Sequence, residues 1–162
     1  MIHICCVQVN NYCERGKDYV NILYDMVKRN MPDVPYKFSV FTDDVWGYNS
    51  EINLKIIQDP VSGWWNKLYL FKHGIFLPDE LVIYFDLDTL ITGPLDDILD
   101  YKGRFAILYN AYWQEHPKRW QSSVMMWRGG FGAHLWDKWI NENQPHIPGG
   151  DQHWIMRHVP KA

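Results

Sequence analysis

The order of apolar and polar positions along the chain predicts alternating strands and helices. Apolar stretches predict strands over residues 2–9, 36–41, 52–57, 81–85, 104–109 and 123–127. Amphipathic stretches predict helices over residues 20–27, from residue 63 onward, over 131–140 and from residue 151 onward, with a short helix or turn at 95–99. Strands alternate with helices in the first half, which is typical of βαβ units and a mainly parallel sheet.

The second predicted helix carries a charged residue beside its apolar face. Trp64, Trp65, Leu68 and Phe71 are spaced as the buried stripe of a helix. Lys67 flanks this stripe, and a lysine that leans toward the protein interior needs an anion as a partner. The alternative is an ammonium group that reaches back to water along the surface, which is common for lysine.

The fourth predicted strand ends in two carboxylates. The apolar run Leu81–Phe85 indicates a strand buried on both faces, and Asp86, Leu87 and Asp88 follow it. Because side chains alternate along a strand, Asp86 and Asp88 are expected to point the same way while Leu87 turns back to the core. Two neighbouring carboxylates repel each other, and a divalent cation removes that cost. The alternative is a solvated turn, where aspartate is common.

Length and composition predict one domain over residues 1–162 with a substantial core. The chain has a mass of 19.4 kDa, and 47% of its residues are apolar. Most of its nine tryptophans are expected to fill the core, and the others suit a carbohydrate or nucleotide cleft, because flat rings stack on sugar faces and bases. The net charge of −3 argues against nucleic acid as a partner, since that needs a basic face.

The cysteines and the chain start predict a cytoplasmic protein. Two of the three cysteines, Cys5 and Cys6, are adjacent in the first predicted strand, and the three have neither zinc-ligand nor disulfide-framework spacing. They are typical of small buried hydrophobic residues in a reducing compartment. We expect no signal peptide and no membrane span, because Met1 leads straight into a strand and no long apolar segment occurs.

The segment around the two carboxylates resembles a known family. The sequence IYFDLDTLITGPLDDIL resembles the Asp-x-Asp region of GT-A glycosyltransferases, and it is most similar to glycosyltransferase family 8, which includes glycogenin and bacterial lipopolysaccharide galactosyltransferases. Four further motifs occur in the family's order, at residues 41–44, 63–68, 122–126 and 150–152. A single Asp-x-Asp is weak evidence, whereas the ordered set is specific.

The resemblance implies a fold and an activity. The fold would be the GT-A αβα sandwich around a mainly parallel mixed sheet. The activity would be metal-dependent transfer of a sugar from a nucleoside-diphosphate sugar to a glycan, lipid or protein acceptor, with retention of configuration. Asp86 and Asp88 would hold Mn²⁺ or Mg²⁺, which prefer oxygen ligands.

The resemblance also assigns roles to individual residues. The implied nucleotide-sugar ligands are Asn11, Tyr12, Asp43, Asp44, Lys67, Leu87, Ser122 and Ser123, and the implied catalytic residues are Asp151 and Gln152. Each role has a structural alternative. Asp43 and Asp44 suit an Asx turn, the two serines suit the start of a strand, and Asp151 suits a helix N-cap.

One family feature is missing, and it leaves two alternatives open. Family members usually supply a third metal ligand from a C-terminal His-x-x-Gly-x-Lys-Pro-type segment, which is absent here, so we expect the chain to be C-terminally incomplete. A catalytically silent nucleotide-sugar-binding module is the first alternative. A haloacid-dehalogenase-like phosphatase is the second and poorer one, because Thr89 directly follows Asp88 and Leu90 takes the position where that chemistry needs Thr or Val.

Overall fold

A six-stranded mixed sheet forms the centre of the protein. The computed structural model describes residues 1–10, 15–110 and 119–160. The strands are β1 (Ile2–Gln8), β2 (Tyr36–Thr42), β3 (Asn53–Ile56), β4 (Leu81–Phe85), β5 (Phe105–Asn110) and β6 (Arg119–Arg128). Their spatial order is β3-β2-β1-β4-β6-β5. Strands β1 to β4 pair in parallel, whereas β6 runs antiparallel to both β4 and β5. The predicted mainly parallel mixed sheet is confirmed.

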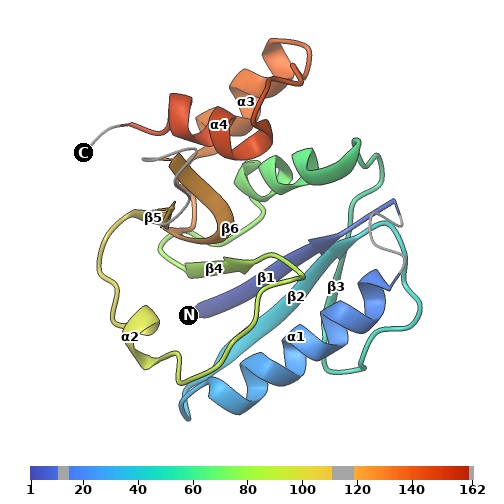
Figure 1. Ribbon diagram of the computed structural model, residues 1–162, viewed down its shortest axis with the longest axis vertical. Coiled ribbons are helices and arrows are strands. Elements are labelled where there is room, and N and C mark those ends of the chain that lie inside the picture. The colour runs from blue at the N-terminus through green and yellow to red at the C-terminus, as the bar shows by residue number, and fades with distance from the viewer. Residues whose placement is uncertain (11–14, 111–118, 161–162) are drawn as a thin grey trace.

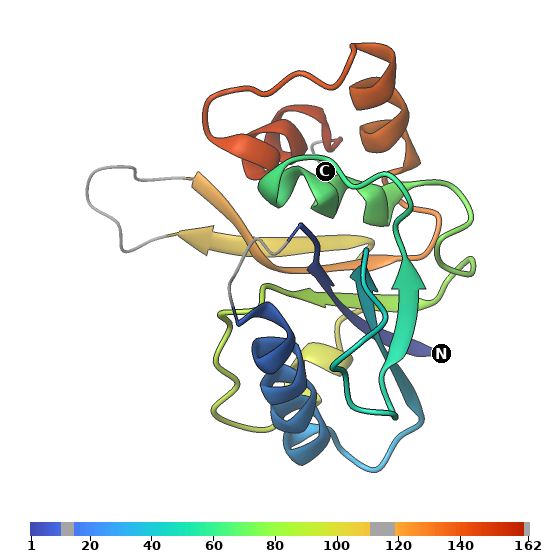
Figure 2. The same ribbon diagram turned by 90° about the vertical axis from the view of Figure 1, so that its right-hand side faces the viewer.

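Helices cover both faces of the sheet. They are α1 (Gly16–Asn30), the 3₁₀-helix η1 (Gly63–Phe71), α2 (Asp96–Leu99), α3 (Ala133–Asn141) and α4 (Gly150–His158). Helices α1 and α2 lie against one face, while η1, α3 and α4 lie together against the other (Figures 1 and 2). The architecture is an αβα sandwich. No helix in the described part of the chain is both long and apolar enough to cross a lipid bilayer.

Strand β4 divides its side chains between two hydrophobic cores. Leu81, Ile83 and Phe85 pack in the cluster beneath α1, whereas Val82 and Tyr84 pack in the cluster beneath η1, α3 and α4. All five are buried, as the apolar run predicts. Each large apolar side chain that is buried contributes about 1.5–3 kcal/mol to stability, so both faces hold this strand in place.

The element that begins at Gly63 is a 3₁₀-helix, and this changes which side chains it buries. Side chains three residues apart are eclipsed in a 3₁₀-helix. Trp65, Leu68 and Phe71 therefore form one buried row. Trp64 falls on the adjacent row with Lys67 and remains 49% exposed. The prediction that Trp64 is buried is wrong: Lys67 and Leu70 on the same row are buried, whereas Trp64 stands in the first turn of the helix and is exposed there.

Two further predictions need correction at the ends of elements. Ser122 and Ser123 do not begin a strand, because β6 already starts at Arg119. Asp151 is not a helix cap: the N-cap of α4 is Gly149, and no side chain caps this helix. Gly149 has a φ of +86°, a left-handed conformation that suits glycine. Asp151 is therefore free of a capping role.

Candidate active site

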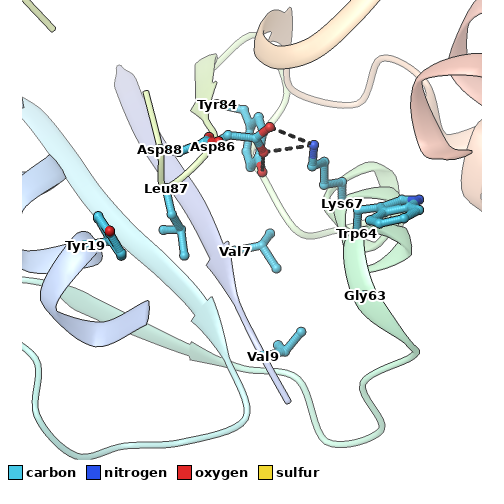
Figure 3. A pocket seen from close by; sticks show the side chains of 10 residues that line it. All are labelled: Val7, Val9, Tyr19, Gly63, Trp64, Lys67, Tyr84, Asp86, Leu87 and Asp88. Carbon is cyan, nitrogen blue, oxygen red and sulfur yellow. Dashed lines mark hydrogen bonds and ion pairs between the residues drawn. The ribbon is translucent and has the colours of Figure 1, made fainter. Parts of the chain in front are cut away.

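A cavity lies at the carboxyl end of β4, the edge where ligands bind in open α/β sheets. This first cavity has a volume of about 270 Å³ and is lined by Val7, Val9, Tyr19, Gly63, Trp64, Lys67, Tyr84, Asp86, Leu87 and Asp88 (Figure 3). The predicted carboxylate pair and the predicted lysine thus come together in one place.

Asp86 extends the strand by one residue, and a turn follows. Its backbone N–H donates to the Ser123 carbonyl at 2.8 Å, which continues the pairing of β4 with β6. The Thr89 N–H then donates to the Asp86 carbonyl at 3.1 Å and closes the turn. Strand alternation therefore places Asp86 on the face of Tyr84, but it no longer governs Leu87 and Asp88. Leu87 packs against the core beneath α1, as predicted, and also lines the cavity together with both carboxylates.

Lys67 is held between two carboxylates. Its Nζ lies 2.8 Å from Oδ1 of Asp86 and donates to Oδ2 of the same residue at 3.0 Å. It also donates to the Ser122 hydroxyl at 3.1 Å and lies 3.7 Å from Oδ2 of Asp151. The side chain is almost fully buried, so its charge offsets carboxylates that would otherwise be costly to bury. The anion that Lys67 needs is thus present within the protein.

Tyr84 is a member of the site that the sequence reasoning missed. Its hydroxyl donates a hydrogen bond to Oδ1 of Asp86, and its ring centroid lies 5.6 Å from the Lys67 ammonium. Burial raises the pKa of Tyr84 well above its usual value, and the Asp86 charge adds to the shift, so the phenol stays protonated as a donor. Its position two residues before Asp86, on the same strand face, was the available sequence indication.

Asp151 presents a buried carboxylate to a second cavity. This second cavity has a volume of about 560 Å³ and is lined by Trp64, Lys67, Asp86, Gln121, Ser122, Ser123, Ile147, Pro148, Gly149, Gly150, Asp151 and Gln152. Burial raises the pKa of Asp151, while Lys67 and a hydrogen bond with Ser122 act in the opposite direction. Among the described atoms, Oδ2 of Asp151 has no hydrogen-bond partner. This oxygen can accept a hydrogen bond from a ligand hydroxyl.

The remaining predicted residues lie away from these two cavities or outside the described chain. Asp43 accepts a hydrogen bond from the Asn10 backbone at 2.9 Å. Asp44 pairs with Lys17 and accepts from the Trp46 backbone at 3.0 Å, the Asx arrangement expected as its structural alternative. Neither lines the first or second cavity. Their contact with a nucleotide stays a prediction. Asn11 and Tyr12 lie outside the described residues.

Asp86 and Asp88 can supply only part of the coordination of a divalent metal ion, so a bound ligand and water would have to supply the rest. In the described ranges, no group of three or more His, Cys, Asp or Glu residues is placed to hold a metal ion. Asp86 and Asp88 offer carboxylate oxygens, the ligand type that Mg²⁺ and Mn²⁺ prefer. Mg²⁺ commonly binds through one or two carboxylates together with substrate phosphates and water. The pair therefore fits an ion whose coordination is completed by a phosphorylated ligand, and such an ion competes with Lys67 for Asp86.

Comparison with known proteins identifies similarity in structure but not in sequence. No family model and no curated protein matches the sequence. The galactosyltransferase LgtC, solved in complex with donor and acceptor sugar analogs, matches with a TM-score of 0.65 and 13% identity over 94% of this chain and 69% of its own. An active-site Gln-to-Glu mutant of LgtC matches with a TM-score of 0.67, also at 13% identity, over 94% and 68% of the two chains.

A second glycosyltransferase has the same fold. GlyE of Streptococcus pneumoniae TIGR4 matches with a TM-score of 0.67 and 14% identity, over 97% of this chain and 43% of its own length. At these identities the likeness concerns the fold. Together with the sheet order and the helices on both faces, it establishes that this chain has the GT-A glycosyltransferase fold.

Proposed function

We propose that this protein is a metal-dependent glycosyltransferase that moves a sugar from a nucleoside-diphosphate sugar to an acceptor hydroxyl. One observation carries the proposal: Lys67, Asp86 and Asp151, from three separate segments, meet at the carboxyl end of the sheet. The fold shared with LgtC and GlyE supports it, since both are glycosyltransferases.

The first cavity suits the nucleoside diphosphate. Val7, Val9 and Leu87 give it an apolar wall for the base and ribose, while Asp86 and Asp88 stand at its polar end. These two carboxylates would hold Mg²⁺ or Mn²⁺, and that ion would neutralise the diphosphate charge as the nucleotide leaves. The Lys67 ammonium adjoins the same place and would bind the diphosphate oxygens.

The second cavity suits the donor sugar. Oδ2 of Asp151 would accept a hydrogen bond from a sugar hydroxyl, because among the described residues this oxygen has an ion pair with Lys67 at 3.7 Å but no hydrogen-bond donor. Ser122, Ser123 and Gln152 line the same cavity and would orient the ring. Gln152 is the residue proposed to lie beside the reacting carbon, with Asp151 holding the sugar in register.

The proposed reaction exchanges one bond at the anomeric carbon for another. The acceptor hydroxyl oxygen forms a bond to that carbon, and the bond from the carbon to the diphosphate oxygen breaks. The diphosphate leaves with the bonding electron pair, and the hydroxyl proton passes to the departing diphosphate. Retention of configuration is part of the proposal and rests on the resemblance to glycosyltransferase family 8. Cytoplasmic placement is also proposed, and the buried free thiols of Cys5 and Cys6 support it.

The two alternatives are not favoured by the comparisons. LgtC and GlyE are both glycosyltransferases, so the fold supports neither the phosphatase nor, by itself, a silent module. Incubation with UDP- and GDP-sugars and Mn²⁺ separates all three. The proposal predicts metal-dependent release of nucleoside diphosphate. Cleavage of p-nitrophenyl phosphate would indicate the phosphatase, and binding of nucleotide sugar without turnover would indicate the module.

A further inference from the structure

Trp64 is shared by three cavities. It lines the first and second cavities, and it also lines a third cavity of about 730 Å³ at the start of η1. The third cavity is lined by Asn10, Ser62, Gly63, Trp64, Trp65 and His146. Figure 3 shows the Trp64 indole projecting from η1 beside Lys67. A ligand in the third cavity therefore shares one wall with the site where Lys67, Asp86 and Asp151 meet.

The indole of Trp64 is positioned by a glycine of α4. A Cβ atom added at Gly150 would lie 2.4 Å from Nε1 and 3.0 Å from Cδ1 of Trp64, so a side chain there would displace the ring. Gly150 also has a φ of +68°, which suits glycine. The ring is exposed on one side and fitted to the α4 backbone on another. Such a surface needs little reordering when a ligand arrives.

The third cavity has the chemistry of a neutral, ring-shaped ligand with hydroxyl groups. Its walls are aromatic: Trp65 stacks on His146 with centroids 5.1 Å apart, and Trp64 stands beside them. Its polar side chains are Asn10, Ser62 and His146, and the Asn10 amide nitrogen donates to the Val61 carbonyl at 2.8 Å, which leaves the amide oxygen as an acceptor. No Lys, Arg, Asp or Glu is among its described lining residues, whereas Lys67 and Asp86 line both other cavities. A pyranose matches this combination, because its C–H face packs on an aromatic ring while its hydroxyls bond to amides.

We infer that the third cavity is a saccharide-binding subsite in which a pyranose ring of the acceptor stacks on Trp64. That this pyranose belongs to the acceptor rests on the proposed function. That the cavity binds a pyranose rests only on the residues that line it. The volume lies within the range of small-ligand sites. Because Trp64 also lines the second cavity, a saccharide bound in the third cavity would lie next to the proposed donor sugar.

Saturation-transfer NMR on the full chain tests this inference. The probes are the methyl glycosides of glucose, galactose, mannose and N-acetylglucosamine, without nucleotide. The wild type should transfer saturation to the ring C–H protons of at least one glycoside. Trp64→Ala should weaken that binding roughly tenfold, while Trp64→Phe should keep most of it by preserving an aromatic face. Trp46→Ala is the matched control, since Trp46 is 76% exposed and lines none of the three cavities.

Two further variants locate the ligand. His146→Leu alters the third cavity alone and should weaken glycoside binding, whereas Gln121→Ala alters the second cavity alone and should not. Absence of transfer to all four glycosides would overturn the inference, as would full binding by Trp64→Ala. Calorimetric titration of the same samples with UDP and GDP plus Mn²⁺ keeps the two ideas apart. If the protein binds nucleotide but no glycoside, the subsite is contradicted and the proposed transferase is not. If it binds a glycoside but no nucleotide, the proposed transferase is contradicted and the subsite is supported.

Discussion

The ammonium of Lys67 forms an ion pair with both carboxylate oxygens of Asp86, with Nζ 2.8 Å from Oδ1 and 3.0 Å from Oδ2. Both oxygens of a proposed metal ligand are therefore engaged by an internal cation. Tyr84 donates to one of them as well. A divalent ion that binds Asp86 must share it with these groups or displace them. A diphosphate that arrives with the ion offers Lys67 a new anion, which links metal binding to nucleotide binding.

The first prediction concerns binding of the metal alone. Lys67→Met should strengthen binding of Mn²⁺ without nucleotide, because it removes a positive charge from a site where Asp86, Asp88 and Asp151 then remain. Titration calorimetry with MnCl₂ measures this directly. Lys28→Met is the matched control, since Lys28 forms an exposed ion pair with Glu51. Equal or weaker Mn²⁺ affinity in Lys67→Met would contradict the competition.

The second prediction concerns the nucleotide. Lys67→Ala should weaken nucleoside diphosphate binding in the presence of Mn²⁺ by about tenfold to a hundredfold, because a charge-assisted hydrogen bond contributes about 1.5–3 kcal/mol. Binding of the bare nucleoside should be unchanged, since it has no phosphate. Competition titrations with UDP and uridine, or GDP and guanosine, compare the two. If nucleoside and diphosphate weaken alike, Lys67 acts by packing η1 instead.

The third prediction concerns the charge of Asp151. Because its pKa is raised by burial, the folded state binds this proton more tightly than the unfolded state. Its contribution to stability is then greatest below the ordinary aspartate range and is lost as pH rises through the folded pKa. Asp151→Asn cannot ionise, so its melting temperature relative to the wild type should increase from acid toward neutral pH.

Thermal melts across pH measure this difference, with the exposed Asp100→Asn as control. If the melting-temperature difference between Asp151→Asn and the wild type stays flat or decreases with pH, the charge of Asp151 does not destabilise the folded protein. The same variant should lose most sugar transfer while it keeps its nucleotide affinity. Near-normal turnover would contradict the role of Asp151 at the donor sugar.

The fourth prediction concerns the packing of Gly150 against Trp64. Gly74→Ala should lower the free energy of unfolding by about 1–2 kcal/mol, because Gly74 has a left-handed φ, like Gly150, but open space around it. Gly150→Ala should cost more, since its Cβ also collides with the indole. Adding Trp64→Ala should return the cost of Gly150→Ala to the Gly74→Ala level. Urea unfolding measures the free energy of unfolding of each variant. Equal losses of stability for Gly74→Ala and Gly150→Ala would show that Trp64 does not pack against α4.

The sequence predicts the sheet and the carboxylate edge well, because those features depend on local patterns. The five apolar residues before Asp86 are buried on two faces, and the lysine of η1 does face an anion. Its partners could not be predicted, since Asp86 and Asp151 lie 19 and 84 residues away from Lys67. The packing of η1 on the sheet brings Lys67 to Asp86, and the docking of α4 against η1 and β6 adds Asp151.

The errors have equally local causes. The spacing of Trp64 with Leu68 and Phe71 predicts a core position, but Trp64 stands in the first turn of η1 and is exposed. The sequence offers Asp151 as an N-cap, but the N-cap of α4 is Gly149, two residues earlier, and the Asp151 carboxylate lies 3.7 Å from Lys67 instead. Neither the 3₁₀ geometry nor a shift of two residues in a helix cap leaves a clear mark in composition or spacing.

Binding of a nucleoside diphosphate to Asp88→Asn tests the central claim most directly. Asp88 lines the first cavity, and unlike Asp86 it is not part of the ion pair with Lys67, so its amide variant should keep the fold. Calorimetry with UDP or GDP, with and without Mn²⁺, should detect metal-dependent binding in the wild type and its loss in Asp88→Asn. Metal-dependent binding of equal strength in the variant would contradict the proposed metal site and the glycosyltransferase function built on it.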